Sequence, residues 1–514
     1  EAARTWEDKL QSALLESAGE ARGNELNRKY CNAFARSYKE EVLPSAAVVD
    51  IEKLEMLSDD NKLEMLFYRP QEEASSNIVR LSLFHKDEPI HLSDVMPMLE
   101  NFGLRVVGET PYSVKTSDGG VNWVMDFSML IDSKGMADFD KISARFRAAL
   151  TSVWANRLEN DGFNRLVLMG GLTGRESSIL RAYAKYMRQI GVTFSQTYIE
   201  STFANYPHIA AKIVNLFSKK FSVKSPASAK TLEKLGLEIY AELENVANLD
   251  DDRIIRLYVD MIVATLRTNY FQKDAEGKFK SYISLKIQPS LIPEVPLPVP
   301  AFEIFVYSPR VEGVHLRFGK VARGGLRWSD RREDFRTEVL GLVKAQQVKN
   351  TVIVPVGSKG GFVCKQLPSE REAFIKEGQE CYKIFIRGLL DITDNIDRGE
   401  IVPAVDVTRH DEDDAYLVVA ADKGTATFSD IANGIANEYN FWLGDAFASG
   451  GSVGYDHKKM GITARGAWES VKRHFREMDI NCQTTDFTAV AIGDMAGDVF
   501  GNGMLLSKHI RLQV

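Results

Sequence analysis

The sequence predicts a multidomain protein of mixed α/β and α+β class. Its 514 residues exceed what one hydrophobic core usually organises. Helical and strand-like patterns alternate in blocks, and the run PSLIPEVPLPVPAF, with five prolines in fourteen residues, must be extended and marks a domain boundary. We therefore expect a helical lead-in, a small α+β module, a helical region, an α/β domain and the start of a further α/β domain.

Residues 1–75 form the predicted helical lead-in. Their large apolar side chains recur at three or four residues, which is the spacing of one helix face. The chain places these residues there: Trp6, Leu10, Leu14, Tyr30, Phe34 and Tyr38.

Residues 76–135 are predicted to form a ferredoxin-like (ACT-like) module. The segments IVRLSLFHK, HLSDVMPMLENFG, LRVVGETPYSV and VNWVMDFSML predict strand, helix, strand and strand, with Ser93 as the N-cap of the helix. Residues 136–288 again show apolar residues at helical intervals. We expect a packed helical region there that carries no chemistry of its own.

Residues 289–475 are predicted to form one α/β domain. AFEIFVYS and VHLRFGKV predict strands, and DFRTEVLGLVKAQQVKN predicts a helix. TVIVPVGSKGG and AYLVVAADKGTATFSD each begin with a short continuous apolar run, which is typical of a buried strand, and then turn polar.

Residues 476–514 are predicted to begin a Rossmann domain, because TAVAIGDMAGDVFGNG has the pattern of a strand, a glycine-rich turn and a helix start. The motif departs from GxGxxG, since Ala491 replaces the first glycine and Gly497 lies one place late. Asp494 and Asp498 would repel a pyrophosphate. The chain begins without Met and stops just after this turn, so we expect sequence to be missing on both sides.

Composition excludes several classes of function. The formal charge of -7 without a dense basic run argues against nucleic acid, and no run approaches the roughly 20 apolar residues that cross a membrane. The four cysteines are scattered singly, which favours a reducing, cytoplasmic setting. His410 and His457 have no third ligand at metal-site spacing, so we expect no metal.

The two buried strands each deliver one ionisable side chain at their C-terminal ends, Lys359 and Asp422. Ligands of open α/β sheets bind at this edge. Gly357 and its neighbouring glycines would let a substrate approach closely. A solvated loop lysine explains this motif equally well.

Basic residues nearby favour a functional lysine. If Arg323, Lys349 and Lys359 converge, they form a site for a dicarboxylate, and each cation disfavours protonation of the next. A lysine starts near a pKa of ~10.4 and needs such crowding to act as a base near neutral pH. Asp422 would then be its proton-transfer partner.

The runs GKVARGGLRWSDRREDFRTEVLGLVKAQQVKNTVIVPVGSKGGFVCK, ADKGTATFSDIAN and GDAFASGGSVGYDHKKMGITARGAWESVKRHF resemble the very large bacterial NAD-dependent glutamate dehydrogenases. The resemblance covers 270–514 closely and the earlier parts more loosely. It implies that 289–475 is a glutamate-dehydrogenase-type substrate-binding catalytic domain, and that this chain is an internal fragment. It also implies L-glutamate and 2-oxoglutarate as reactants, NAD as coenzyme, a homo-oligomer and an amino-acid effector.

The resemblance assigns roles residue by residue. Lys359 resembles the catalytic lysine that polarises water, Lys349 the lysine that grips the α-carboxylate, and Asp422 the aspartate that exchanges a proton with the amine. Arg323 stands where smaller relatives have a lysine. The gap from Lys349 to Lys359 is shorter than in those relatives, which leaves Lys344 as a substitute. The remaining candidates for the substrate site are Gly325, Gly357 and Ser358.

On the coenzyme side, Thr463 resembles the threonine that holds the nicotinamide carboxamide, although a helix-opening threonine explains it equally well. The turn contributes the other candidates: Gly493, Asp494, Met495 and Gly497. Two other functions stay open. One is a dehydrogenase for a different amino acid, such as leucine, and the other is an amino-acid-sensing regulatory or scaffold segment without catalysis.

Overall fold

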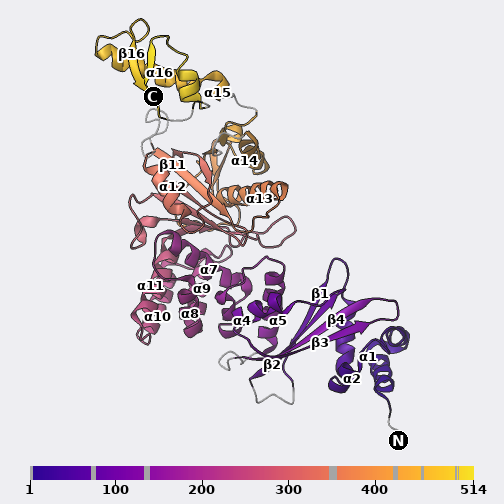
Figure 1. Cartoon of the computed structure of the whole chain (residues 1–514). Coiled ribbons are helices and arrows are strands. Elements are labelled where there is room, and N and C mark those ends of the chain that lie inside the picture. The colour runs from indigo at the N-terminus through magenta and orange to yellow at the C-terminus, as the bar shows by residue number, and fades with distance from the viewer. Residues whose placement is uncertain are drawn as a thin grey trace. The chain divides into compact units, whose positions relative to one another are not determined.

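A computed structural model describes residues 4–70, 77–131, 139–345, 356–420, 426–452, 457–492, 495 and 497–513. The chain divides into two compact units, Glu1–Val263 and Ala264–Val514 (Figure 1). Within the described ranges, every helix is too short or too polar to cross a lipid bilayer.

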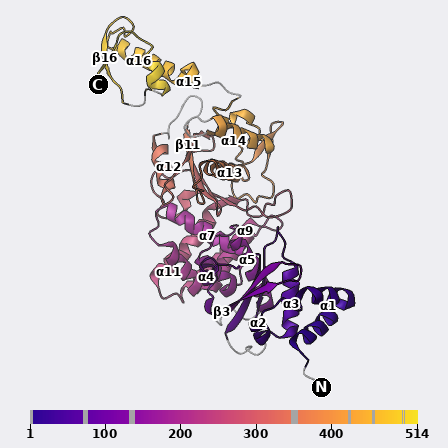
Figure 2. The same cartoon turned by 45° about the vertical axis from the view of Figure 1, so that its right-hand side comes forward.

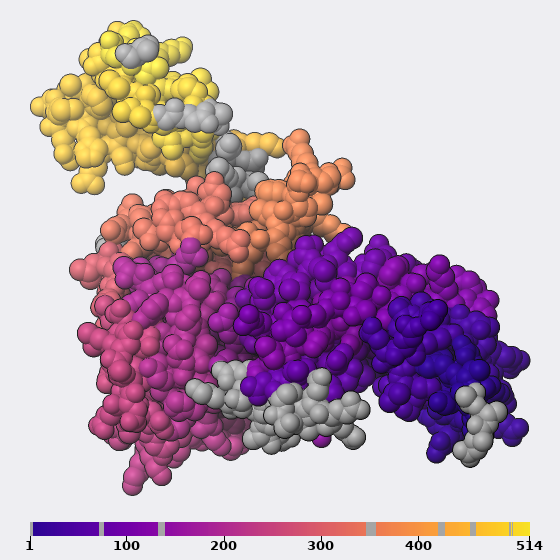
Figure 3. Space-filling view, turned by 60° about the horizontal axis from the view of Figure 1, so that its bottom comes forward, coloured from indigo at the N-terminus to yellow at the C-terminus, as the bar shows by residue number. Residues whose placement is uncertain are grey.

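The first unit opens with helices that cover one face of a sheet: α1 (Trp6–Tyr30), α2 (Arg36–Glu41) and α3 (Pro44–Glu55). Thr5 and Asp8 form a capping box at the start of α1, with the Asp8 amide donating to Thr5 Oγ1 at 3.2 Å. The predicted apolar face is buried at Leu10, Leu14, Tyr30, Phe34 and Tyr38. These helices pack against one face of the sheet, and Figure 3 shows the indigo N-terminal residues directly beside the purple residues that follow them.

The prediction of helix throughout 1–75 is wrong at one segment, which forms strand β1 (Leu63–Tyr68) and pairs antiparallel with β2 (Ile78–Lys86). Met65 and Phe67 face one core of the sheet, whereas Leu66 packs against the core on the other face. A strand covered on both faces lacks the alternation that would distinguish it from a helix.

The strand, helix, strand, strand order of the ferredoxin-like prediction is confirmed: β2, α4 (Leu92–Asn101), β3 (Arg105–Lys115) and β4 (Val121–Leu130). The sheet order is β1-β2-β4-β3, and all neighbouring strands are antiparallel. The strand β1, which precedes the predicted module in the sequence, therefore forms one edge of its sheet. Ser93 is not the N-cap, because α4 begins at Leu92 and His91 occupies the cap position. Helix α4 and the later helix α5 (Phe139–Trp154) cover the face opposite to α1 (Figures 1 and 2).

The helical prediction for 136–288 is confirmed as far as Ala264. The helices are α5 (Phe139–Trp154), α6 (Arg165–Met169), α7 (Gly174–Gln189), α8 (Gln196–Asn205), α9 (Pro207–Phe221), α10 (Ala229–Leu243) and α11 (Leu249–Ala264). Arg181 of α7 is fully buried, and its guanidinium donates to Asp161 at 2.7 Å and to Asn164 at 2.9 Å. These bonds offset the desolvation cost of a charge buried within the bundle.

Beyond Ala264 the helical prediction is wrong, because the chain passes directly into β5 (Thr265–Thr268) and later β6 (Ile283–Ile287). All residues of both strands are buried, so neither shows strand-like alternation. The division between the units therefore falls at 263/264, ahead of the proline-rich segment, which contains the short 3₁₀ turn Pro289–Leu291.

The sheet of the second unit continues with β7 (Phe302–Tyr307), β8 (Val311–Arg317), β9 (Ala322–Arg323), β10 (Leu326–Trp328) and β11 (Val356–Cys364). The strand predictions for AFEIFVYS and VHLRFGKV are confirmed by β7 and β8. The order is β10-β11-β8-β7-β6-β5, with β9 also beside β11. β5 to β8 and β11 pair antiparallel, whereas β9 and β10 run parallel to β11.

Helices cover both faces of this sheet: α12 (Phe335–Lys344) on one, and α13 (Arg371–Leu390) with α14 (Ala426–Glu438) on the other (Figure 2). A Cβ on Gly361 would lie 2.6 Å from Val339 of α12, and one on Gly313 would lie 2.5 Å from Phe385 of α13. Since Lys359 is two residues from Gly361 on β11, it faces the α12 side.

The remaining elements are the hairpin β12 (Asn395–Asp397) and β13 (Glu400–Val402), the parallel pair β14 (Val419–Ala420) and β15 (Ala448–Ser449), the 3₁₀ turn Gly444–Ala446, α15 (His457–Met460), α16 (Ile462–Glu477), and β16 (Phe487–Val490) parallel to β17 (Ile510–Gln513). Between β16 and β17 the described residues include one π-helical turn, Asp498–Asn502.

Candidate functional site

Lys359 lies in the middle of β11, whereas the sequence predicts it at the C-terminal end of a strand. β11 continues to Cys364, and Lys359 stands opposite Leu316 of β8. Its side chain is half-buried. The glycines that suggest a loop instead allow close packing, because a Cβ on Gly360 would lie 2.4 Å from Leu326 Cδ2.

Arg323 ends β9, directly beside the start of β11. Its backbone pairs in parallel with Gly357 on one side and bridges Val418 on the other. The next residue must be glycine, because a Cβ on Gly324 would lie 1.5 Å from the carbonyl oxygen of Ser358. Gly325 follows, and its carbonyl oxygen accepts from the Gly360 amide at 3.1 Å.

These ladders bring three predicted segments side by side. GSKGG, ARGG and the strand before AADKG meet through Gly357, Arg323 and Val418, with all the pairings parallel. Asp422 and Lys349 lie outside the described residues. Asp422 follows Val418 by four residues in the sequence.

The other predicted substrate residues are placed less centrally. Lys344 is the last residue of α12 and is exposed. Ser358 is fully buried, and its Oγ has no hydrogen-bond partner among the described residues. Ser358 stands opposite Arg317 of β8, on the face covered by α13 and opposite to that of Lys359.

A buried charged cluster, which the sequence analysis missed, lies on that α13 face. Its cations come from strands β5, β6 and β8, and its carboxylates from the segment before β14. We define this charged cluster by its members: Arg267, Lys286, Arg317, Asp394, Asp411 and Asp414.

The contacts of the charged cluster are close, and the pair Arg317–Asp414 is bidentate. Arg267 pairs with Asp394 at 2.9 Å and with Asp411 at 2.6 Å. Asp414 accepts from Lys286 at 2.6 Å and from Arg317 Nη1 at 2.9 Å. Multiple charge-assisted hydrogen bonds of this kind are what buried ions need to offset desolvation.

The charged cluster fixes the path of the chain as far as the Val418 bridge. Arg317 Nη1 also donates to the carbonyl oxygen of Tyr416 at 3.0 Å, two residues before the Val418 bridge. The DEDD run at 411–414 is thus clamped onto the sheet, although a run of like charges usually indicates a solvated loop.

Asp414 of this cluster and the neighbouring His315 have shifted pKa values. Burial on its own would raise the pKa of Asp414, but Arg317 and Lys286 outweigh it and hold that pKa below its usual value. Burial, together with Arg317, lowers the pKa of His315 to about 3. Neither ring nitrogen of His315 has a hydrogen-bond partner among the described residues, so its neutral ring is simply enclosed in the core.

The predicted coenzyme residues are only partly described. Thr463 is exposed in the first turn of α16, after Gly461 in the cap position, and its backbone amide donates to Asp498 Oδ2 at 2.9 Å. Met495 is exposed, Gly497 precedes the π-helical turn, and Gly493 and Asp494 lie outside the described residues.

Asp498 makes this turn unlike a phosphate cradle. Its carboxylate caps α16 and accepts from Asn502 at 2.5 Å, and this side-chain contact leads the interactions that lower its pKa. A negative charge is therefore fixed where a pyrophosphate would approach. The parallel pairing of β16 with β17 agrees with the start of a dinucleotide fold, but the described residues do not form a cradle for NAD.

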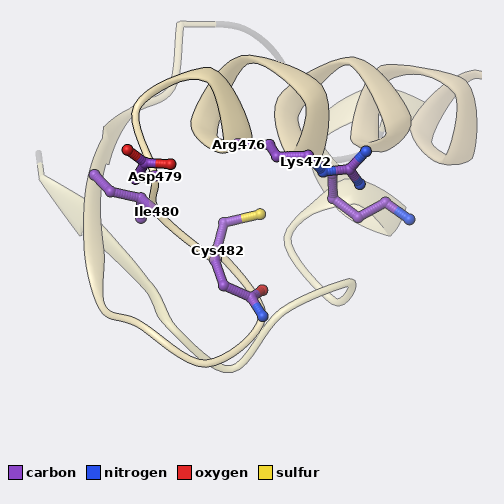
Figure 4. Close-up of a pocket in the computed structure, with 6 residues that line it drawn as sticks. Lys472, Arg476, Asp479, Ile480 and Cys482 are labelled. Carbon is purple, nitrogen blue, oxygen red and sulfur yellow. The ribbon is translucent and has the colours of Figure 1, made fainter.

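A pocket of about 350 Å³ lies at the opposite end of α16 (Figure 4). Lys472 and Arg476 of α16 line it, together with Asp479 and the residues that follow. None of the predicted coenzyme residues lines this pocket. Among the described residues, no three His, Cys, Asp or Glu side chains are grouped to hold a metal ion.

Comparisons with known proteins agree along the whole chain. The family model described as bacterial NAD-glutamate dehydrogenase, catalytic domain, matches residues 238–514. Other glutamate dehydrogenase models match 158–223 (helical motif 3), 62–142 (ACT3 domain) and 13–57 (helical motif 2). The ACT3 match confirms the ACT-like prediction, and it begins at β1.

Curated relatives are similar over nearly all of this chain. The NAD-specific glutamate dehydrogenase of Halomonas elongata is 54% identical over 99% of this chain, and that of Pseudomonas aeruginosa is 53% identical over 100%. The protein of the same name from Mycobacterium tuberculosis is 51% identical over 100%. In each case the match covers 32% of the relative, so the chain spans about a third of their length. By both the family model and these identities, the chain belongs to the bacterial NAD-glutamate dehydrogenase family.

Proposed function

We propose that the protein containing this chain catalyses the oxidative deamination of L-glutamate to 2-oxoglutarate and ammonia, with reduction of NAD. The relatives that match nearly all of this chain carry the name NAD-specific glutamate dehydrogenase. The structural observation that carries the proposal is the parallel pairing of Arg323 with Gly357 and with Val418, which sets the three predicted segments beside one another.

In this proposal the basic residues hold the substrate. Arg323 and Lys349, or Lys344 in place of Lys349, bind the two carboxylates, and the glycines at 325 and 357 leave room for the substrate. A second carboxylate on the substrate explains the excess of basic groups better than the apolar side chain of leucine does.

Lys359 and Asp422 move the protons. NAD, when bound, supplies the acceptor for the hydride that leaves the α-carbon. The neutral amine of Lys359 accepts a proton from the water that adds to the iminium carbon, and Asp422 passes a proton to the departing amine. Half-burial of Lys359 on the α12 face, with its backbone held in β11, restricts where its amine can reach.

The coenzyme domain is proposed to begin with β16, the glycine-rich turn and β17, with Thr463 near the nicotinamide. Gly493, Asp494, Met495 and Gly497 stay the candidate coenzyme residues of this turn. We also propose a homo-oligomeric, cytoplasmic enzyme with an amino-acid effector. The free state of all four cysteines agrees with a reducing compartment.

Replacing Lys359 tests the proposed reaction. In the full-length protein, we expect Lys359→Ala to lower kcat for glutamate by at least about 100-fold, because a positioned acid or base contributes 10²–10⁴-fold. Steady-state NADH formation measures this. Lys376→Ala, an exposed lysine on α13, is the matched control and should keep the wild-type rate.

Two outcomes would favour the alternatives. Unchanged turnover in Lys359→Ala would favour a regulatory or scaffold segment. Faster turnover of leucine than of glutamate by the wild-type protein would favour a dehydrogenase with another substrate.

A further inference from the structure

A second pocket in the unit Ala264–Val514 involves none of the residues assigned to the reaction. It has a volume of about 320 Å³, within the usual range for small-molecule sites. The turn after β5, the C-terminal end of α13, the hairpin β12–β13 and Tyr439 after α14 form its walls. The residues that matter to its chemistry are Gln272, Lys280, Asp391 and Tyr439.

Asp391 places a buried carboxylate in the lining of the pocket. It is the C-cap of α13 and is 2% exposed, although the negative end of a helix dipole disfavours a carboxylate there. Its carboxylate accepts from Lys280 Nζ at 2.5 Å, from the Tyr439 hydroxyl at 2.6 Å and from Asn269 Nδ2 at 2.9 Å. These contacts hold the Lys280 ammonium at the pocket wall.

Gln272 offers a hydrogen-bond acceptor to the pocket. Its side chain is buried, and its Nε2 donates to the carbonyl oxygens of Asp391 at 2.9 Å and of Val405 at 2.7 Å. These two acceptors fix the orientation of the amide, so a flip cannot exchange its atoms. Gln272 Oε1 is buried with no hydrogen-bond partner among the described residues, and a buried acceptor in that state is costly.

We propose that this pocket binds a small zwitterion of the α-amino-acid type. The ammonium group of such a ligand donates to Gln272 Oε1 after a small shift of the hairpin wall, and its carboxylate pairs with Lys280. Lys273 and Asp406, which also line the pocket, add one charge of each sign. An inorganic anion has no donor for Gln272 Oε1. A simple amine has no negative charge to pair with the Lys280 ammonium.

The proposal is tested by a substitution in the hairpin β12–β13 that places a large side chain in the pocket. Val402 lines the pocket and is exposed at its surface, so Val402→Trp should occupy the space without disturbing the buried contacts. Ile401→Trp is the matched control: Ile401 precedes it in β13, is similarly exposed and does not line the pocket. Lys280→Met tests the ion pair in a second way.

Binding is measured by equilibrium dialysis on the full-length protein, with L-alanine, L-leucine and L-aspartate as separate probes and with methylamine and acetate as single-charge controls. At least one zwitterion should bind the wild type and Ile401→Trp, with at least ten-fold weaker binding to Val402→Trp. Lys280→Met should weaken binding similarly.

Binding of no zwitterion to the wild type, or equal binding to the wild type and Val402→Trp, would overturn the proposal. Val402→Trp decides by itself if Lys280→Met fails to fold. The site shares no residue with the proposed reaction, so glutamate turnover by the same preparations reports separately on that function.

Discussion

At the scale of single residues, the sequence identifies chemistry more readily than place. Lys359 stands out because a lysine among glycines is unusual, yet its position inside β11 depends on Leu326 and Val339, which fill the space beside the glycines. No local pattern records those neighbours. The glycines therefore suggest a loop where the chain forms a strand.

The charged cluster shows the same limit. Asp414 bonds to Arg317 and Lys286 across 97 and 128 residues of sequence, so the sequence shows an acidic run and scattered basic residues without their pairing. Gln272 and Lys280 of the second pocket were missed for the same reason. Long-range pairs of this kind require the fold.

His315 makes stability depend on pH. Its pKa is about 3 in the folded chain and ~6.5 when unfolded, so below pH ~6.5 the unfolded state binds a proton that the folded state does not. Stability is lost as pH falls, by about 1.4 kcal/mol per pH unit from this group between pH 6 and 4. Urea unfolding should show a smaller loss in His315→Leu than in the wild type. Parallel pH curves for both proteins would refute this account.

At the scale of elements, amphipathic periodicity predicts the helices well. The prediction of strands fails where a strand is short and covered on both faces. β5 and β6 are buried throughout, and β1 contributes to two cores. Period alone cannot separate such runs from a helix. The turn from β9 to β10 is likewise set by its contact with β11.

The contact between that turn and β11 can be tested at Gly324. A methyl group there would overlap the Ser358 carbonyl oxygen, so Gly324→Ala must push β9 away from β11. We expect a loss of about 3 kcal/mol or more in the free energy of unfolding, at the upper end of overpacking effects. Chemical denaturation measures it.

Gly341→Ala is the matched control on α12, because a methyl group added there would meet no atom within 4 Å and alanine favours a helix by about 1 kcal/mol. It should leave stability unchanged or raise it. Equal midpoints for Gly324→Ala and the wild type would show that β9 does not pack as described.

At the scale of the whole molecule, the sequence indicates multiple domains but misplaces one boundary. The proline-rich segment leads to a predicted boundary at residue 289. The two units instead divide at 263/264, where α11 passes directly into β5. The prolines after residue 288 indicate an extended backbone, but they do not mark the edge of a hydrophobic core.

Two fragments distinguish these boundaries. A fragment of residues 264–514 retains β5 and β6, whereas one of residues 289–514 loses them together with Arg267 and Lys286. The second leaves buried carboxylates without those partners, at a cost of about 3–5 kcal/mol for each broken pair. We expect a cooperative thermal transition by circular dichroism only in the longer fragment. Equal transitions would place the boundary near 289.

The charged cluster also constrains how this family can diverge. Loss of Arg317 would leave the buried Asp414 with Lys286 as its one cation in the cluster, and loss of Asp394 or Asp411 would leave the buried Arg267 with one of its two carboxylates. A substitution at one of these positions therefore becomes tolerable only when its partner changes as well. In aligned homologues, the six positions should covary and should tend to be inherited as a set.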